Sequence, residues 1–119
     1  MKQLNLRINK KHFQEILKGD IKEEVRFLTP DNNDRYVTET ENPDGTINID
    51  PIPYDVIRFS NGPRNNPSRM LVEVKKATFF IVTDEDGNDL TYEESGETYV
   101  VCHVTYELGK VLETENIGE

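Results

Sequence analysis

The chain has 119 residues, of which 34% are hydrophobic and 31% are charged, and its 23 acids and 14 bases give a formal net charge of -9. This length fits one domain, and the single cysteine excludes an internal disulfide framework. No stretch approaches the roughly 18 apolar residues of a membrane span, so we expect no membrane partner. Residues 1–9 lack the apolar run of a signal peptide, so we expect a cytoplasmic protein.

The first elements expected along the chain are a strand and a short helix. Residues 2–8 alternate polar and apolar side chains, which is the period of a half-buried strand. Asn9 is a suitable N-cap, and Gly19 suits the left-handed position after a helix C-terminus. Between them lies an apolar stripe with helical spacing, formed by Phe13, Ile16 and Leu17.

A second strand and a long polar excursion follow the helix. Residues 23–28 alternate so that Glu24 and Arg26 share one face of the strand. Residues 31–53 contain several Asn, Pro and Gly residues and few large apolar ones. We therefore expect a polar excursion there, with a short hairpin around Asp44-Gly45.

The rest of the chain predicts mainly strands. Strand-like patterns occupy the ranges 54–60, 70–82 and 98–112, and the acidic connection 84–97 has a short helix expected near 90–95. Five or six strands with one early helix predict a small β-barrel-like α+β domain. We place this single domain at 1–112, followed by an acidic tail at 113–119.

Motifs for metal binding or nucleophilic catalysis are lacking. Cys102 and His103 are neighbours on a strand and point to opposite faces, and His12 has no companion at ligand spacing. We therefore expect no metal, no cofactor and no catalytic residue.

The bases are concentrated in two ranges of the chain. Residues 1–30 carry seven bases and four acids, and residues 51–81 carry five bases and two acids. Residues 31–50 carry one base and six acids, while 82–119 carry one base and eleven acids. Because phosphates must be neutralised by Lys and Arg, a cationic site has to come from the two basic ranges, and extended duplex DNA is a disfavoured partner.

One segment resembles the signature of a known family. Residues 16–26 read Ile-Leu-Lys-Gly-Asp-Ile-Lys-Glu-Glu-Val-Arg. This is similar to the ASCH-domain signature, in which a helix ending in Ile-Leu-x-Gly precedes a Lys-containing turn and a Glu-x-Arg strand. Further similar elements, within a match over residues 2–108, are Thr29-Pro30, Arg35, the strand from Tyr54 to Phe59, and Asn61-Gly62-Pro63.

The resemblance implies a PUA-like mixed β-barrel with a cleft between barrel and helix that binds RNA or a nucleotide-like molecule. In that cleft Arg26 can offer a planar fork to a phosphate or base edge, and Glu24 can orient Arg26 or accept from a base amino group. Tyr36 or Tyr54 can stack on a base, while Arg58, Arg64 and Arg69 can follow a backbone. The expected binding residues are Lys22, Glu24, Arg26, Arg35, Tyr36, Arg58, Asn61, Gly62 and Arg64.

Three alternatives stay open. In the simplest, Glu24 and Arg26 form a local ion pair and Arg58 is merely exposed. In the second, the protein is an amidohydrolase acting on a modified nucleoside such as acetylcytidine. Some ASCH relatives have this activity, with a Lys and a Thr at the positions that hold Ile21 and Glu24 here, and this departure weighs against an enzyme. In the third, the acidic 82–97 loop binds a basic protein.

Overall fold

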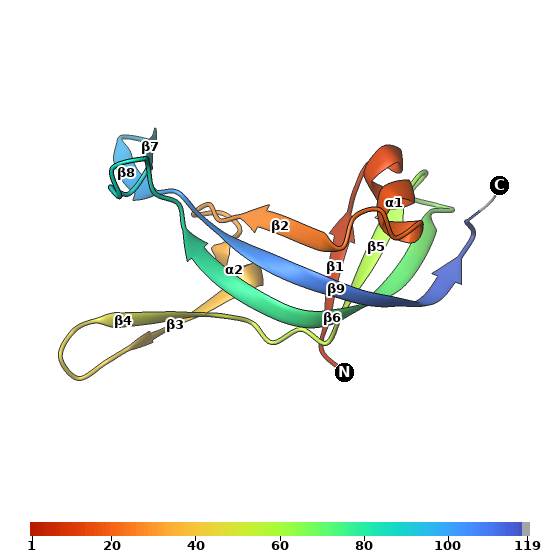
Figure 1. The fold of residues 1–119 in the computed structure, drawn as a ribbon, viewed down its shortest axis with the longest axis horizontal. Helices are drawn as coiled ribbons and strands as arrows, with labels where there is room; N and C mark the ends of the chain where they lie inside the picture. Colours follow the sequence, from red (N-terminus) through yellow and green to blue (C-terminus); the bar gives the residue numbers. More distant parts are fainter. Residues whose placement is uncertain (118–119) are drawn as a thin grey trace. The chain divides into compact units, whose positions relative to one another are not determined.

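The computed structural model describes residues 1–117, and most of them form strands. The elements, drawn in Figure 1, are in chain order β1 (Gln3–Arg7), α1 (Lys10–Leu17), β2 (Glu23–Phe27), α2 (Asn33–Tyr36), β3 (Val37–Glu41), β4 (Ile47–Pro51), β5 (Val56–Asn61), β6 (Ser68–Ile81), β7 (Thr91–Glu94), β8 (Glu97–Val100) and β9 (Cys102–Glu115). The expected strand-rich α+β class is confirmed. The nine strands among the described residues exceed the five or six expected, because both polar connections contain hairpins.

Helix α1 begins and ends at the predicted signals. The side chain of Asn9 accepts a hydrogen bond of 2.8 Å from the backbone N–H of His12, which satisfies one of the donors exposed at a helix N-terminus. Gly19 follows the helix with a φ of +84°, a conformation that costs glycine little. Phe13 and Ile16 are the buried residues of the helix.

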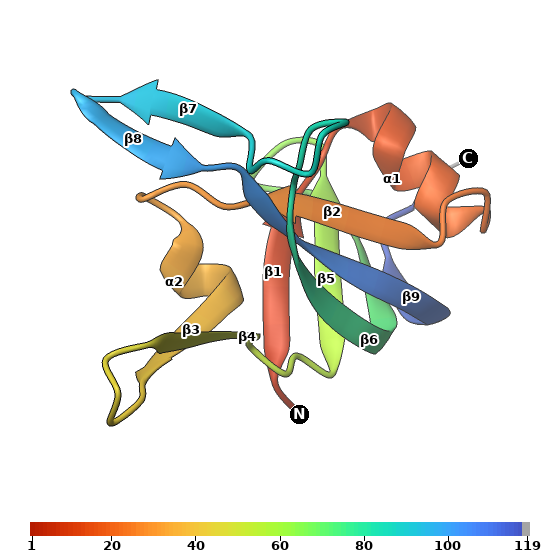
Figure 2. The ribbon, with the colours of Figure 1, turned by 60° about the vertical axis from the view of Figure 1, so that its left-hand side comes forward.

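Five strands form one curled sheet in the order β1-β5-β6-β9-β2. Strand β1 runs parallel to β5, as Figure 2 shows, with Leu4 opposite Ile57 and Leu6 opposite Phe59. Strand β6 runs antiparallel to β5 and sets Met70 opposite Phe59. All five side chains are buried, so the register keeps one face of these strands on the core.

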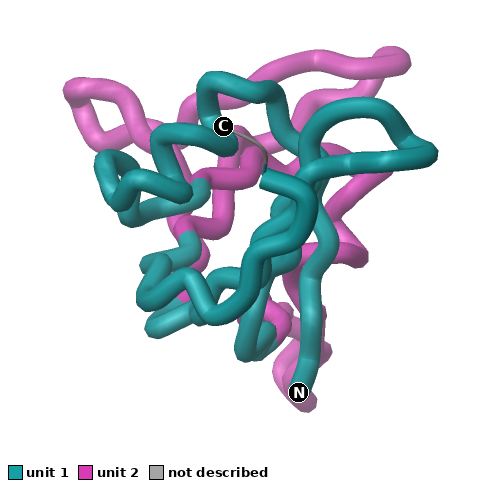
Figure 3. The backbone as a smooth tube through the Cα atoms, turned by 90° about the vertical axis from the view of Figure 1, so that its right-hand side faces the viewer, with its two compact units in different colours: residues 1–24, 53–76, 106–119 teal, residues 25–52, 77–105 magenta. Residues whose placement is uncertain are grey.

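The chain forms two compact units, which Figure 3 distinguishes by colour. Unit 1 comprises residues 1–24, 53–76 and 106–119, and unit 2 comprises residues 25–52 and 77–105. The ranges of unit 1 carry twelve bases and ten acids, whereas those of unit 2 carry two bases and thirteen acids. The formal charge is therefore +2 for unit 1 and -11 for unit 2.

Most of the hydrophobic core belongs to unit 1. Eleven of the fifteen buried apolar side chains of the described residues lie there, including Phe13, Ile57, Phe59 and Tyr106. Unit 2 contributes four, namely Leu28, Tyr36, Val37 and Val104. Since apolar burial is the main favourable term in folding, unit 1 has the larger share of that stabilisation.

The polar excursion over 31–53 contains regular secondary structure. It holds α2 and the antiparallel pair β3 and β4, whose connection contains Asp44 and Gly45, so the expected hairpin is confirmed. The carboxylate of Asp44 accepts hydrogen bonds from the backbone N–H and the hydroxyl of Thr46, at 3.0 and 2.6 Å. These bonds favour the ionised form and lower the pKa of Asp44.

The prediction of a short helix near residues 90–95 is wrong. Strands β7 and β8 form an antiparallel hairpin there, with Tyr92 opposite Tyr99. The two connecting residues, Ser95 and Gly96, have φ angles of +53° and +83°. A two-residue connection with positive φ matches the twist of a hairpin, and the Thr and Tyr residues beside it favour strands over a helix.

The last strand also ends later than the sequence indicated. Strand β9 continues to Glu115 instead of stopping at Leu112. Residues 118–119 of the expected tail lie outside the described residues, so the division into a domain over 1–112 and a tail over 113–119 stays a prediction.

The capping interaction of α1 gives a test of the fold. Replacing Asn9 with Ala removes the acceptor for the His12 N–H and should lower the free energy of unfolding by about 1 kcal/mol. Asn9→Asp keeps an acceptor and should retain most of the stability. Urea denaturation of the two variants, with the exposed loop change Asn65→Ala as control, measures the difference. Equal losses for Asn9→Ala and Asn9→Asp would contradict the capping role.

Candidate functional site

A buried carboxylate lies at the start of β2. Glu24 is 3% exposed and is the one buried polar or charged side chain among the described residues. Its Oε1 atom lies 2.6 Å from Nε2 of His12 on α1. An ionised carboxylate can only accept hydrogen bonds, so this contact requires a proton on Nε2 when Glu24 is charged. Burying a carboxylate costs free energy unless it is hydrogen-bonded, and His12 helps to meet this requirement.

Sequence reasoning missed the partnership of His12 and Glu24. The two residues are twelve positions apart, and the turn after α1 brings them together. That turn is closed by backbone hydrogen bonds from Asp20 and Ile21 to the carbonyl of Glu15. No spacing rule relates a helix position to a strand position across such a turn. The alternation on β2 pointed the other way, because its apolar residues Val25 and Phe27 are 43% and 57% exposed while Glu24 faces inward.

A second feature of unit 1 is a pocket of about 440 Å³, here called the lysine pocket. It lies between the C-terminal end of α1 with the following turn and the central parts of β6 and β9. Its charged lining residues are four lysines and one glutamate: Lys18, Lys22, Lys75, Lys110 and Glu73. The sequence indicated Lys22 as a binding residue but missed the other three lysines, which come from different elements.

Gly109 determines how the side chains of β6 sit in the lysine pocket. A Cβ atom at this position would overlap Oε1 of Glu73 and would lie 3.1 Å from Cγ of Lys75. The absent side chain therefore leaves room for both residues over β9. The backbone N–H of Lys110 donates to Oε1 of Glu73 over 3.4 Å. Glu73 thus offsets part of the positive charge that the lysines bring to the pocket.

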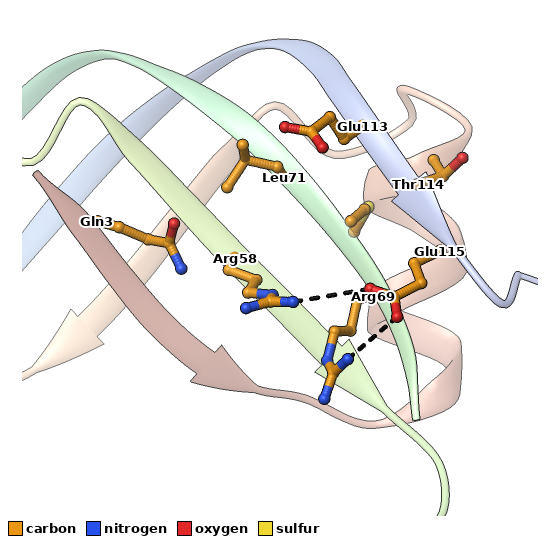
Figure 4. Close-up of a pocket in the computed structure, with 8 residues that line it drawn as sticks. Gln3, Arg58, Arg69, Leu71, Glu113, Thr114 and Glu115 are labelled. Atoms are coloured by element: carbon orange, nitrogen blue, oxygen red, sulfur yellow. Dashed lines mark hydrogen bonds and ion pairs between the residues drawn. The ribbon is translucent and has the colours of Figure 1, made fainter. Parts of the chain in front are cut away.

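Two arginines meet one carboxylate in a second pocket of unit 1, the arginine pocket, which Figure 4 shows. Arg58 on β5 lies 3.6 Å from one oxygen of Glu115, and Arg69 on β6 lies 3.2 Å from the other. The pocket has a volume of about 420 Å³. The Glu115 side chain is 58% exposed, so each ion pair is worth only about 0–1 kcal/mol.

The Asn61-Gly62 segment has structural contacts. The side-chain amide of Asn61 donates to the carbonyl of Ile8 over 2.8 Å, and the carbonyl of Gly62 accepts from the guanidinium of Arg7. Both bonds attach the loop after β5 to the end of β1. Arg64 is exposed in the same loop.

The remaining expected residues belong to unit 2. Arg26 is half-buried, and Arg35 is exposed, with its guanidinium carbon 5.7 Å from the centre of the Tyr36 ring. Tyr36 itself is 2% exposed, which corrects the prediction that it stacks on a base, because its ring faces are covered. Tyr54, in unit 1, packs edge-on against Tyr106 at 6.5 Å between ring centres.

No group of three or more His, Cys, Asp or Glu side chains suited to a metal ion occurs within residues 1–117. None of the helices in that range is long and apolar enough to cross a membrane.

Comparison with known proteins gave no match to a family model, to a curated protein or to a solved structure. The resemblance to ASCH domains therefore rests on the motif residues of this chain alone.

The buried pair predicts a measurable coupling between His12 and Glu24. Either single change to Ala leaves a partner with one hydrogen bond fewer and should lower the free energy of unfolding by about 1–3 kcal/mol. The double variant should lose less than the sum of the two, with a coupling of at least about 0.5 kcal/mol. Urea denaturation of a double-mutant cycle measures it, with the exposed change Glu107→Ala as control. Additive losses would show that the two side chains do not support each other.

Proposed function

We propose that this protein binds RNA or a nucleotide-like ligand in the lysine pocket of unit 1. The observation that carries the proposal is the convergence of four lysines and one glutamate on one concave site. A lysine ammonium is a point charge on a flexible stem, so four of them can adapt to one or more phosphate groups.

The lysine pocket also offers apolar contact. Ile16, Val72 and Leu108 line it together with the charged residues. A volume of about 440 Å³ lies within the range of small-molecule sites, which are usually clefts of about 300–1,000 Å³. An apolar surface beside cationic side chains suits a ligand with a flat base or sugar and a charged phosphate.

A short single strand can contact both pockets of unit 1, because β6 and β9 line both of them. Strand β6 supplies Leu71 to the arginine pocket and Glu73, two positions later, to the lysine pocket. Strand β9 likewise supplies Glu113 to the arginine pocket and Val111 to the lysine pocket. A strand of a few nucleotides can therefore place one phosphate at the lysines and another at Arg58 and Arg69, displacing Glu115.

We further propose that the chain is an ASCH domain with a PUA-like barrel. The curled, strand-rich sheet supports this assignment, and so does the helix that ends before Gly19. In this proposal the lysine pocket, which Lys22 helps to line, serves as the cleft between barrel and helix. Glu24 is directed to His12 instead, so the ligand contacts expected of Glu24 pass to Glu73 and the lysines.

Binding should depend on salt and on the lysines of the pocket. Fluorescence anisotropy with a labelled oligouridylate should show an affinity that falls as the salt concentration rises. The slope of the logarithm of the binding constant against the logarithm of the salt concentration should become shallower by about 0.7 for each phosphate that a variant no longer neutralises. The variant with Lys22→Glu and Lys110→Glu should bind more weakly and with the smaller slope.

The matched control changes Lys10 and Lys11 to Glu. Both are exposed on α1 and line neither pocket, and the change in net charge is identical. This control should retain nearly all binding. Equal losses in the two variants, or an affinity that does not respond to salt, would refute the assignment of the lysine pocket.

One observation favours a second candidate, the amidohydrolase. The His12 and Glu24 pair places an imidazole beside a buried carboxylate, an arrangement that can accept a proton from water. In that reaction water adds to the acetyl carbonyl carbon of acetylcytidine, the carbon–nitrogen bond breaks, and the cytosine amino nitrogen takes up a proton. Chromatography would detect the released cytidine, and His12→Gln should lower the rate by about 100-fold or more. A wild-type protein that releases no cytidine would exclude this candidate for that substrate.

A further inference from the structure

Unit 2 combines strong negative charge with exposed apolar side chains. Its ranges carry thirteen acids and two bases. Eight of the ten large hydrophobic side chains that are exposed among the described residues also lie in this unit, with Phe27 and Ile47 each 57% exposed. Two of these side chains, Ile49 and Val100, line one groove, and a contiguous apolar surface commonly marks an interaction site. The charge favours a cationic partner and disfavours a nucleic acid.

A groove of about 270 Å³ lies within unit 2, here called the hairpin groove. The β3–β4 hairpin contributes Val37 and Ile49 to it, and the β7–β8 hairpin contributes Tyr92 and Tyr99. Phe79 of β6 also lines it. The groove is thus largely apolar and aromatic, and it is bordered by two hairpins.

The two tyrosines form a stacked pair next to carboxylates. The ring centres of Tyr92 and Tyr99 are 5.5 Å apart with an angle of 29° between the planes. The hydroxyl of Tyr99 donates to Glu97 over 3.0 Å. This hydrogen bond raises the pKa of Tyr99, and burial followed by the charge of Glu94 raises the pKa of Tyr92. Both rings therefore stay neutral at physiological pH, within a negative environment.

We propose that the hairpin groove binds an extended basic segment of another protein, in which arginine or lysine side chains alternate with aliphatic ones. The aliphatic side chains and the stems of the cationic ones enter the apolar groove, and a guanidinium stacks on Tyr92 or Tyr99. The charged ends reach Glu39, which lines the groove, and Glu97, which lies beside Tyr99. Of the acidic 82–97 segment, for which a basic partner was expected, this proposal uses Tyr92 and Glu97.

Binding of such a segment should stabilise the two hairpins that border the groove. The pairs β3–β4 and β7–β8 are each two-stranded sheets. An isolated two-stranded hairpin is marginally stable at best. A segment that contacts both hairpins should therefore slow hydrogen exchange at the amides of Thr38 and Tyr99, on β3 and β8.

The test is a titration of the full-length protein with a fluorescein-labelled peptide of alternating arginine and leucine, followed by anisotropy. A matched peptide with glutamine in place of arginine should bind at least tenfold more weakly. The variant with Glu39→Gln and Glu97→Gln should lose about tenfold in affinity. Tyr99→Leu should lose about fivefold, and Tyr99→Phe, which keeps the ring, should lose less than twofold.

The control variant changes Glu85 to Gln and Asp86 to Asn. Both residues are exposed outside the groove in the same unit, and the change in net charge equals that of the Glu39 and Glu97 variant. Its affinity should stay within twofold of the wild type. The lysine-pocket variant Lys22→Glu should also keep peptide binding, so this proposal and the proposed function can fail separately.

Several results would overturn the proposal. If the control variant and the Glu39 and Glu97 variant lost equal affinity for the peptide, the binding would be nonspecific attraction to the charge of unit 2. Equal binding of the glutamine peptide would remove the cationic specificity. Sedimentation that shows a dimer dissociated by the peptide would assign the groove to a second copy of this chain, and competition by oligouridylate at the groove would assign it to nucleic acid.

Discussion

A shortage of apolar side chains constrains this protein more than any other feature. With 34% hydrophobic residues the chain can close one tight core, and eleven of the fifteen buried apolar side chains are in unit 1. The lysine and arginine pockets depend on that core, because α1, β5, β6 and β9, which line them, contribute side chains to it. Unit 2 has few buried side chains, so its hairpins present Tyr92, Tyr99 and Ile49 at a groove instead of enclosing them.

The net charge of -9 is distributed unequally between the two units. Twelve of the fourteen bases lie in the ranges of unit 1, at a local charge of +2, while unit 2 carries -11. An anionic ligand and a cationic partner can therefore each find a suitable surface on one small chain. The same division limits the anionic ligand to a small one, because the acids of unit 2 oppose the long-range approach of an extended polyanion.

Local signals in the sequence were sufficient for elements that depend on neighbouring residues. Asn9 and Gly19 defined α1, alternation defined β1, and Asp44-Gly45 marked a hairpin, since each rests on backbone chemistry within a few positions. The site depended on contacts that no local pattern encodes. His12 meets Glu24 across a turn, and Lys75 and Lys110 join Lys18 through the placement of separate strands. The burial of Tyr36 was equally invisible, because the four-residue helix that carries it has no apolar periodicity.

The parallel pairing of β1 with β5 affects when the chain can fold during its synthesis. Leu4 must wait for Ile57, more than fifty residues later, before the two strands can join, and β9 is synthesised later still. Contacts so distant in sequence slow folding, and during synthesis the N-terminal strand and helix remain without partners. The segments made in the interval include the acidic, hydrogen-bonded β3–β4 hairpin, whose charge discourages association between unfinished chains. The core of unit 1 can therefore close only after β9 has been made.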